Sequence, residues 1–453
     1  MRAPMGRFQL KRLDLRHATA AAVVPVCLLA TTAAAEDGAL EIEGSVRARL
    51  EAIDGQFRAG AANGGALFLR TQLRAEYDAG PIRIGGEIQD ARVYFERQPS
   101  SIGTTEVDTF EPIQAYVVGE LGAKTELQVG RMTMDLGSRR LVSRQNFRNS
   151  TNAFTGVRFD WRPAKGDALT LFWTMPHDRL PNDSDGIRDN EFALNRERVD
   201  QQLFGAHSVK SKLFKTASLE TYLYRLTERD GANFSTRNRH LWTGGFRILK
   251  PARAKAFDFE LEAIGQRGTT RASTSAADRA DLNVKAYFVH VAVGHTFAAA
   301  WSPRLVVSYD RASGDGGGRG YGRFDTLFGA RVFEYGPSSL YGPIGRANLN
   351  SPELRLEVKP NKRWDGYVAG RPLWLESATD TFASTGLRDA RGTSGRYAGT
   401  QFDARARYWL TPDRVRIAAG AAVLAKGRFL EDAPGSPSNG NTHFGYVEVT
   451  YGF

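Results

Sequence analysis

The feature that most constrains this chain is a two-residue alternation of apolar and polar side chains, which recurs from residue 40 to the C-terminus. In 40–50, for example, every second residue is apolar or small, and the residues between them are Glu, Ser or Arg. A period of two places the two sets on opposite faces of a β-strand. Runs of roughly 8–12 residues are typical of strands that cross a membrane with one lipid face and one lumen face, whereas strands of soluble sandwiches are usually about 5–6 residues long. The length of the runs therefore predicts an all-β fold, a transmembrane antiparallel β-barrel.

The number of alternating segments indicates the size of this barrel. We count about eighteen strands, an even number, as single-chain bacterial barrels have. The least regular of them are expected near 201–210, 216–227, 239–249, 284–293 and 362–374.

The connections between these segments fall into two classes of length. Short connections are expected to be periplasmic turns, and they lie at 78–81, 121–124 and 411–413. Long polar connections are expected to be extracellular loops, and they lie at 134–153, 176–200, 268–282, 311–351, 376–396 and 430–441. The Gly-rich segment 311–351 also contains the apolar run FDTLF. We expect it either to fold into the lumen as a constriction or to remain a surface loop.

The N-terminus carries the pattern of an export signal. Five basic residues precede or border an apolar core at 18–30, and Ala33, Ala34 and Ala35 supply the small residues of a cleavage site. We predict a secretory signal peptide at 1–35 and a barrel domain at 36–453; a membrane anchor fits the short apolar core poorly. Cleavage lowers the formal net charge from +11 to +7 and removes Cys27, the one cysteine.

The C-terminus ends on an aromatic residue. Val447, Val449, Tyr451 and Phe453 share one face of the last alternating segment. Barrel-assembly machinery is understood to read a terminal strand of this kind. We therefore expect that machinery as a partner through Phe453, with outer-membrane lipid around the barrel and the outer membrane of a Gram-negative bacterium as its location.

Composition excludes several classes of protein. Outside the N-terminus no run of eighteen apolar residues occurs, which excludes a helical membrane protein. Of 61 basic residues, 49 are arginines, whose planar guanidinium binds carboxylates through two donors. A basic protein can bind nucleic acid, but the export signal argues against that partner. An acidic polymer or a small anion is expected instead.

Catalytic and metal-binding motifs are missing from the sequence. Six histidines follow the signal segment, and none stands in a G-x-S-x-G or H-E-x-x-H context. We therefore expect neither an enzyme nor a cofactor or metal.

Several short motifs resemble the alginate export family of outer-membrane β-barrels. They are Q-D-x-R at 89–92, V-G-R at 129–131, L-G-S-R-R-L-V at 136–142, N-F-R-N at 146–149, F-x-G-V-R at 154–158, F-D-x-L-F at 324–328 and N-L-x-x-P-E at 348–353. The resemblance implies a barrel with an electropositive lumen that passes an anionic saccharide, an alginate-like polyuronate or a related organic anion. A periplasmic scaffold that feeds polymer into it is then a separate protein.

The polar faces of the predicted strands, together with the arginine-rich segment 134–153, supply candidate residues for such a lumen. Rings of arginine select anions, although arginines and acids on facing strands also pair simply to hold a wall together. The predicted electropositive, substrate-binding residues are Arg47, Arg49, Arg70, Arg74, Arg92, Arg131, Arg139, Arg140, Arg144, Arg148, Arg158, Arg304, Arg355, Arg405 and Arg407. The predicted orienting acids are Glu76, Glu87, Asp90, Asp160 and Glu357. Asp90 and Arg92 share the parity of Ile84 and Ile88, so a bulge or strand end is needed to turn them inward.

Two other functions remain open at this point. A general or substrate-specific porin for nutrient uptake would conduct small neutral solutes. A non-conducting barrel for adhesion or assembly would use its loops and show no conductance.

Overall fold

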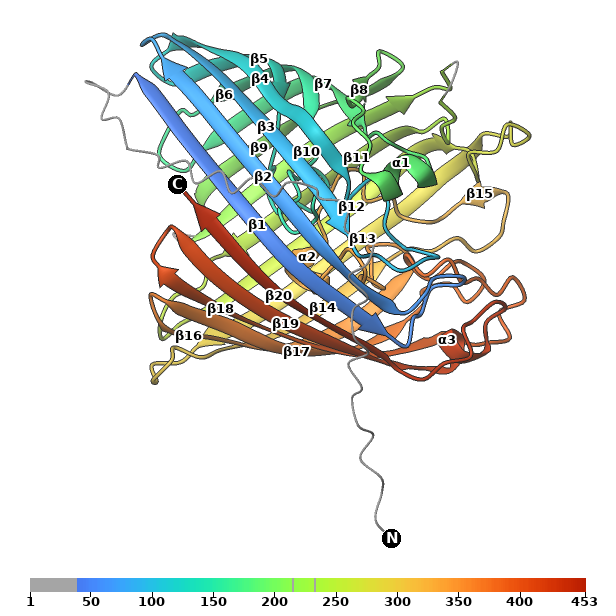
Figure 1. Cartoon of the computed structure of the whole chain (residues 1–453). Helices are drawn as coiled ribbons and strands as arrows, with labels where there is room; N and C mark the ends of the chain where they lie inside the picture. The colour runs from blue at the N-terminus through green and yellow to red at the C-terminus, as the bar shows by residue number, and fades with distance from the viewer. Residues whose placement is uncertain (1–38, 214–215, 232–233) are drawn as a thin grey trace. The chain divides into compact units, whose positions relative to one another are not determined.

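The computed structural model describes residues 39–213, 216–231 and 234–453, and the predicted signal peptide at 1–35 lies outside them. Eighteen long strands form a closed antiparallel barrel, as predicted (Figure 1). In order around the wall they are β1 (Leu40–Asp54), β2 (Gly64–Asp78), β3 (Ile82–Tyr94), β4 (Asp108–Gly122), β5 (Thr125–Met132), β6 (Phe154–Trp161), β7 (Ala168–Asp178), β9 (Gln201–Leu213), β10 (Ala217–Glu228), β11 (His240–Lys250), β12 (Phe257–Thr270), β13 (Leu282–Thr296), β14 (Arg304–Ala312), β16 (Leu349–Asn361), β17 (Trp364–Trp374), β18 (Tyr397–Thr411), β19 (Val415–Lys426) and β20 (Thr442–Gly452). The remaining elements are short: β8 (Arg196–Glu197), β15 (Gly320–Tyr321), α1 (Ser184–Asp189), α2 (Val332–Tyr335) and α3 (Arg428–Asp432).

The barrel closes between its first and last strands. β20 pairs with β1 from Ser45 opposite Gly452 to Asp54 opposite His443. Beyond the last pair, the backbone N–H of Gly44 donates to the carbonyl of Phe453 at 2.9 Å. Closure removes free strand edges, which an antiparallel sheet in lipid requires because unpaired backbone groups are costly there.

The two faces of the wall follow the period of two. On β1, Val46 and Leu50 are exposed on the outer face, while Arg47, Arg49 and Glu51 point inward and are buried. The same parity holds around the barrel and gives an apolar outer face with exposed Trp and Tyr, as in barrels that face lipid. Among the described residues, no helix has the length and apolar character needed to span a bilayer.

The short and long connections lie at opposite ends, because each strand reverses the direction of the one before it. The short-turn end holds the predicted turns at 78–81, 121–124 and 411–413, and the long-loop end holds the polar connections. Two of these enter the lumen, which corrects the prediction of an extracellular loop for 134–153 and agrees with the first of the two arrangements expected for 311–351. Residues 133–153, between β5 and β6, and residues 313–348, between β14 and β16, contact strands on several sides of the lumen; we call them inward loop 1 and inward loop 2. α2, which belongs to inward loop 2, is seen within the ring of strands in Figure 1.

Candidate functional site: a polar lumen crossed by two loops

Inward loop 1 is held by arginines of the first two strands. Arg47 donates to the carbonyls of Asn146 and Arg148 at 2.8 and 3.0 Å. Arg49 donates to the carbonyl of Phe147 at 2.6 Å. Arg70 reaches the Asn146 and Arg148 carbonyls at 3.2 Å. Carbonyls satisfy the N–H donors of a guanidinium but do not neutralise its charge; Arg49 also pairs with Glu51 at 2.7 Å and Arg47 with Glu448 at 3.8 Å, whereas Arg70 has no ion pair among the described residues.

Inward loop 2 attaches to β1 and β18. The backbone N–H of Leu340 donates to Glu51 at 3.1 Å, and Arg49 donates to the Ser339 hydroxyl at 3.1 Å. On the other side, the Tyr341 hydroxyl donates to Gln401 at 2.9 Å. The predicted constriction is therefore the arrangement that the structure shows for this segment.

The two inward loops also bind each other. Val142 and Phe328 form an isolated parallel bridge, and the Phe328 N–H donates to the Leu141 carbonyl at 2.9 Å. The backbone approach is closest at Gly329, where an added Cβ would lie 1.7 Å from the Arg140 carbonyl oxygen. Only glycine fits there, so the contact depends on this residue.

Replacing Gly329 by alanine is expected to push the two inward loops apart. Overpacking of this kind costs about 1–3 kcal/mol, and the backbone oxygen of Arg140 has no flexible end that can move aside. The change is checked by limited proteolysis of the refolded barrel, in which both loops become cleavable. Gly316→Ala in the same loop, where an added Cβ meets nothing within 4 Å, is the control; equal cleavage of the two variants would contradict the prediction.

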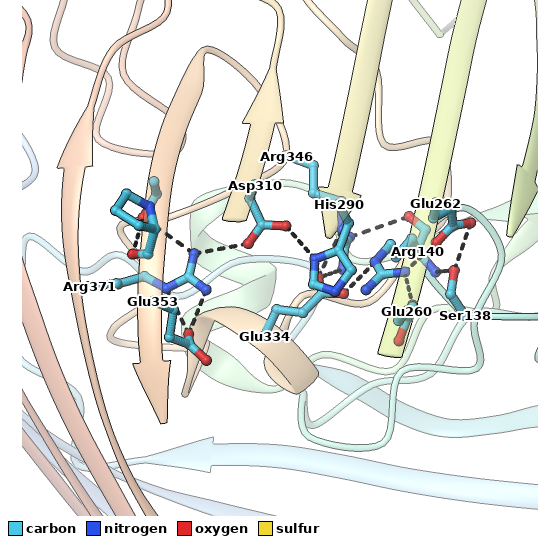
Figure 2. Close-up of polar contacts among 12 residues, drawn as sticks. Ser138, Arg140, Glu260, Glu262, His290, Asp310, Glu334, Arg346, Glu353 and Arg371 are labelled. Atoms are coloured by element: carbon cyan, nitrogen blue, oxygen red, sulfur yellow. Dashed lines mark hydrogen bonds and ion pairs between the residues drawn. The ribbon is translucent and has the colours of Figure 1, made fainter. Parts of the chain in front are cut away.

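A buried ionic network ties both loops to the wall opposite β1 (Figure 2). Arg140 of inward loop 1 forms ion pairs with Glu260 and Glu262 of β12 and with Glu334 of α2. Arg346 of inward loop 2 binds Glu334 at 2.5 Å. Burial alone lowers the pKa of Arg140, but the three carboxylates outweigh it and raise that pKa well above its usual value. Glu334 is the residue through which the two loops share one charge network.

Acid is expected to loosen the inward loops through Glu334. Burial alone raises its pKa, but Arg140 and Arg346 outweigh burial and hold the pKa of Glu334 below its usual range. A depressed carboxylate pKa stabilises the folded loops above the unfolded value, about 4.3, and this contribution is lost as pH falls through the lower folded value. Channel conductance should therefore rise below about pH 4.

The measurement is single-channel conductance against pH. Glu334→Gln should flatten the acid response, because the titrating group is gone. Asp185→Asn removes a carboxylate that is 80% exposed in α1 and should leave the response intact. An unchanged pH profile in Glu334→Gln would contradict the assignment.

The wall beside this network carries a second chain of buried charges, also drawn in Figure 2. His290 and Asp310 lie 2.7 Å apart, Arg371 binds Asp310 at 3.1 Å, and Arg371 also pairs with Glu353. These residues come from β13, β14, β16 and β17. Arg371 lies between two carboxylates, so the chain holds neighbouring strands together and adds no unpaired cation to the lumen.

A large cavity lies on the short-turn side of the inward loops. It has a volume of about 870 Å³. Its lining holds nine cationic side chains, Arg47, Arg70, Arg253, Arg304, Arg355, Lys359, Arg405, Arg407 and Arg416, and three carboxylates, Glu357, Asp365 and Glu448. Low-dielectric walls and a charge excess of one sign focus a positive potential inside such a cavity.

Aromatic rings line part of this cavity next to the arginines. The guanidinium carbons of Arg355 and Arg405 lie 4.2 and 5.1 Å from the ring centre of Tyr367. Arg405 has no ion-pair partner among the described residues, whereas Arg407 pairs with Asp365 at 2.8 Å. A guanidinium without a carboxylate partner can bind an anionic group through two parallel N–H donors.

Two further cavities extend the polar lumen beside β2 to β6. One, of about 790 Å³, is lined by Arg74, Glu87 and Arg144 among others. The other, of about 360 Å³, is lined by Arg74, Glu76, Arg158 and Asp160. Here most charges are paired, as Arg74 with Glu76 at 2.9 Å and Arg158 with Asp160 at 2.7 Å. In the 870 Å³ cavity five of the nine cations are also paired, and the four that form no ion pair with described residues are Arg70, Arg253, Lys359 and Arg405.

Most of the predicted lumen residues lie inside the barrel. Those that line one of the three cavities are Arg47, Arg70, Arg74, Arg144, Arg158, Arg304, Arg355, Arg405 and Arg407, with the acids Glu76, Glu87, Asp160 and Glu357. Arg49 and Arg140 are buried in ion pairs. Arg139 stacks 3.7 Å from the ring centre of Phe333, and burial lowers the pKa of Arg148.

The predicted lumen position of Asp90 and Arg92 is wrong. They pair with each other at 2.9 Å on the outer face of β3. Bulges do occur in the pairing of β3 with β4, but their extra residues, such as Ile113, belong to β4. The alternation of β3 is therefore unbroken, and nothing turns these two side chains inward.

The predicted lumen position of Arg131 is also wrong. It shares the parity of Val129, which is exposed on the outer face. Its guanidinium binds Glu111 at 2.6 Å and Glu197 at 3.0 Å, beneath the connection between β7 and β9. In the sequence Arg131 directly precedes the loop arginines, so its position along the chain gives no sign of the outward parity.

Several charged residues of the lumen were not predicted. Glu334 and Arg346 lie in a loop without periodicity, and Arg371 lies in β17, whose alternation is weak. The sequence gives one sign of the inward position of Arg371. It lies two residues before Leu373 and therefore on the same face of the strand, and both side chains point inward.

Comparison with solved structures supports the fold. The barrel is similar to three outer-membrane porins of Pseudomonas aeruginosa. OccD3 (OpdP) has 12% identity and a TM-score of 0.57 over 92% of this chain and 91% of that one. OccK8 (OprE) has 10% identity and a TM-score of 0.60 over 91% of this chain and 98% of that one. OpdQ has 12% identity and a TM-score of 0.59 over 92% of this chain and 99% of that one. At such identities the similarity shows the fold alone.

Comparison with sequences is more specific. No curated protein matches the chain significantly. The family model described as alginate export matches residues 39–444, which is almost the whole barrel. Its family and its fold are those of transport barrels and not of enzymes. By that match, and in agreement with its closed barrel of eighteen strands, this chain belongs to the alginate export family of outer-membrane channels.

Proposed function

We propose that this outer-membrane channel passes an anionic polysaccharide, such as an alginate-like polyuronate, through its arginine-rich lumen. The observation that carries the proposal is the 870 Å³ cavity, with nine cationic side chains against three carboxylates. A fixed positive field lowers the free energy of a carboxylate inside the pore and excludes cations. Arg405 beside Tyr367 is the group best placed to bind one uronate unit.

In this proposal the long-loop end faces the outside of a Gram-negative cell, and the short-turn end, with its cationic cavity, faces the periplasm. Polymer would then meet the 870 Å³ cavity before it meets the inward loops. A separate periplasmic scaffold is the expected source of the polymer. Phe453 remains the expected contact for barrel-assembly machinery.

A second candidate is passage of small organic anions. It is favoured by the inward loops, which are tied to the wall by buried ion pairs and to each other by the bridge between Val142 and Phe328. A polymer needs these ties to open, whereas a small carboxylate needs only a gap beside them. One of the structurally similar barrels, OpdK, was solved with vanillate, a small carboxylate.

The reversal potential of the refolded protein in a planar bilayer under a salt gradient tests the proposal. Anion selectivity together with block by short oligouronates is expected. Selectivity without block, with permeation of single uronates, would favour the second candidate. Conductance without selectivity would overturn both and leave a general porin.

A further inference from the structure

Three cations form a row on the outer face of the barrel near its long-loop end. Arg225 of β10 is in register with Trp242 of β11, Trp242 with Arg267 of β12, and Arg267 with Lys285 of β13. The inward residues of these strands alternate with them, so all four side chains point outward. Arg225 lies 5.1 Å from the ring centre of Trp242. We call these four residues the cation row.

The cation row marks a boundary on this face. The next register row toward the loops is polar, with Thr227, His240, Thr269 and Asn283. The rows toward the middle of the barrel are apolar, beginning with Leu223, Gly244, Gly265 and Tyr287. Cations and Trp at such a boundary lie at the level of lipid headgroups.

The row directly below contains a groove. Gly244 and Gly265 stand side by side in register, and a Cβ added to Gly265 would meet nothing within 4 Å. The resulting hollow has a volume of about 460 Å³, is mostly apolar, and ends at Arg267 and Lys285. The Tyr287 hydroxyl donates to Glu376 at 3.0 Å, which fixes the ring as one side of the groove. A cationic rim above an apolar groove is complementary to a headgroup above an acyl chain.

The charge of the row is not neutralised within the described part of the chain. Arg225 donates to the His240 carbonyl at 3.3 Å, and neither it nor Arg267 nor Lys285 has a carboxylate at ion-pair distance there. The next outward arginine, Arg311, does have one, Glu376. A ligand that fills both parts carries an anionic group at the cations and an alkyl chain in the groove, and a phosphate-bearing membrane lipid has both.

We propose that the cation row and the glycine groove form a binding site for a phosphate-bearing lipid. The phosphate contacts Arg225, Arg267 and Lys285, and one acyl chain lies over Gly244 and Gly265 against Leu223 and Tyr287. The site is separate from the lumen and does not depend on what the channel transports.

The experiment counts lipid bound to the folded barrel in detergent by native mass spectrometry, with diphosphoryl lipid A as the probe. Arg267→Gln/Lys285→Gln should raise the dissociation constant about thirtyfold, since a cation near a lipid surface contributes about 1 kcal/mol. Gly265→Leu should raise it about tenfold by displacing roughly two methylenes of the chain from the groove. Lys250→Gln, at the short-turn end of the same outer face of β11, is the matched control and should bind like the parent.

The outcomes separate the alternatives. Loss of binding in both variants, with dephosphorylated lipid A bound weakly by the parent, supports the site. Binding by Arg267→Gln/Lys285→Gln within twofold of the parent overturns it, as does equal binding of the dephosphorylated lipid. A parent dimer that Gly265→Leu converts to a monomer, without a change in lipid bound, overturns it in favour of contact between copies. The double variant is confined to exposed side chains, so it tests the proposal even if Gly265→Leu does not fold.

Discussion

Replacing Arg140 by leucine is expected to release both inward loops and to increase single-channel conductance several-fold. Arg140 is buried and pairs with Glu260, Glu262 and Glu334. Without it, three carboxylates remain close together inside the lumen. Breaking a buried ion pair by removing one partner costs about 3–5 kcal/mol, and here the like charges that remain repel each other as well. The inward loops should therefore leave the wall and the lumen should widen.

The measurement is conductance in a planar bilayer, combined with the rate of proteolysis of the inward loops. Arg428→Gln is the matched control, because Arg428 forms an exposed pair with Asp432 at 3.3 Å, and exposed pairs contribute about 0–1 kcal/mol. Adding Glu262→Gln to Arg140→Leu should return part of the closed state, because Glu260 keeps Arg247 and Glu334 keeps Arg346 as partners, and only Glu262 is left without a cation among the described residues. Parental conductance in Arg140→Leu would show that the ion pairs do not hold the loops.

Reversing three charges of the cationic cavity is expected to abolish anion selectivity. Arg253, Lys359 and Arg405 line the 870 Å³ cavity, and none has an ion-pair partner among the described residues. Changing all three to glutamate turns nine cations and three carboxylates into six of each. A balanced lining no longer favours anions, so the reversal potential under a salt gradient should approach zero.

The control is a second triple variant that changes the net charge by the same amount, but at residues outside the lumen. Arg388, Arg391 and Arg428 are exposed at the long-loop end, and their change to glutamate should leave the reversal potential near that of the parent. Salt screens exposed charges beyond about 10 Å at 0.1 M, so the two triple variants are compared at that concentration or above, where the control charges act least on the pore. Equal shifts in both would mean that selectivity reflects the charge of the whole protein.

The strands and their faces could be predicted because a single physical rule governs them. Lipid outside and water inside force an alternation that Arg47, Arg49 and Arg405 obey, and the structure places each on the inner face. The exceptions are local. Ile113 has the parity of Val117, which is exposed on the outer face, but it is fully buried, since it is the extra residue of a bulge in β4. A bulge leaves no mark on composition, so period alone cannot find it.

The inward loops could be predicted only in part. A loop that lines a water-filled lumen and a loop exposed to bulk water need the same polar residues, so the segment 134–153 reads as extracellular. The segment 311–351 gives a clearer signal, because its apolar run FDTLF is expected to be buried. In the structure the ring centres of Phe328 and Phe154 lie 5.5 Å apart. The pairing of Arg140 with Glu262 joins residues 122 positions apart. No local sequence pattern predicts a contact between residues so far apart in the chain.

The seam between β1 and β20 has a consequence for the order in which the molecule forms. Arg49 of β1 binds Glu448 of β20 at 3.4 Å, across 399 positions of sequence, and its other donors reach Phe147 and Ser339 in the two inward loops. Contacts between the chain ends form late, because loop closure must come first. The inward loops are made before β20 and can hold β1 through Arg47 and Arg49 until the last strand arrives. The two inward loops can thus act as an internal template on which the nascent barrel closes.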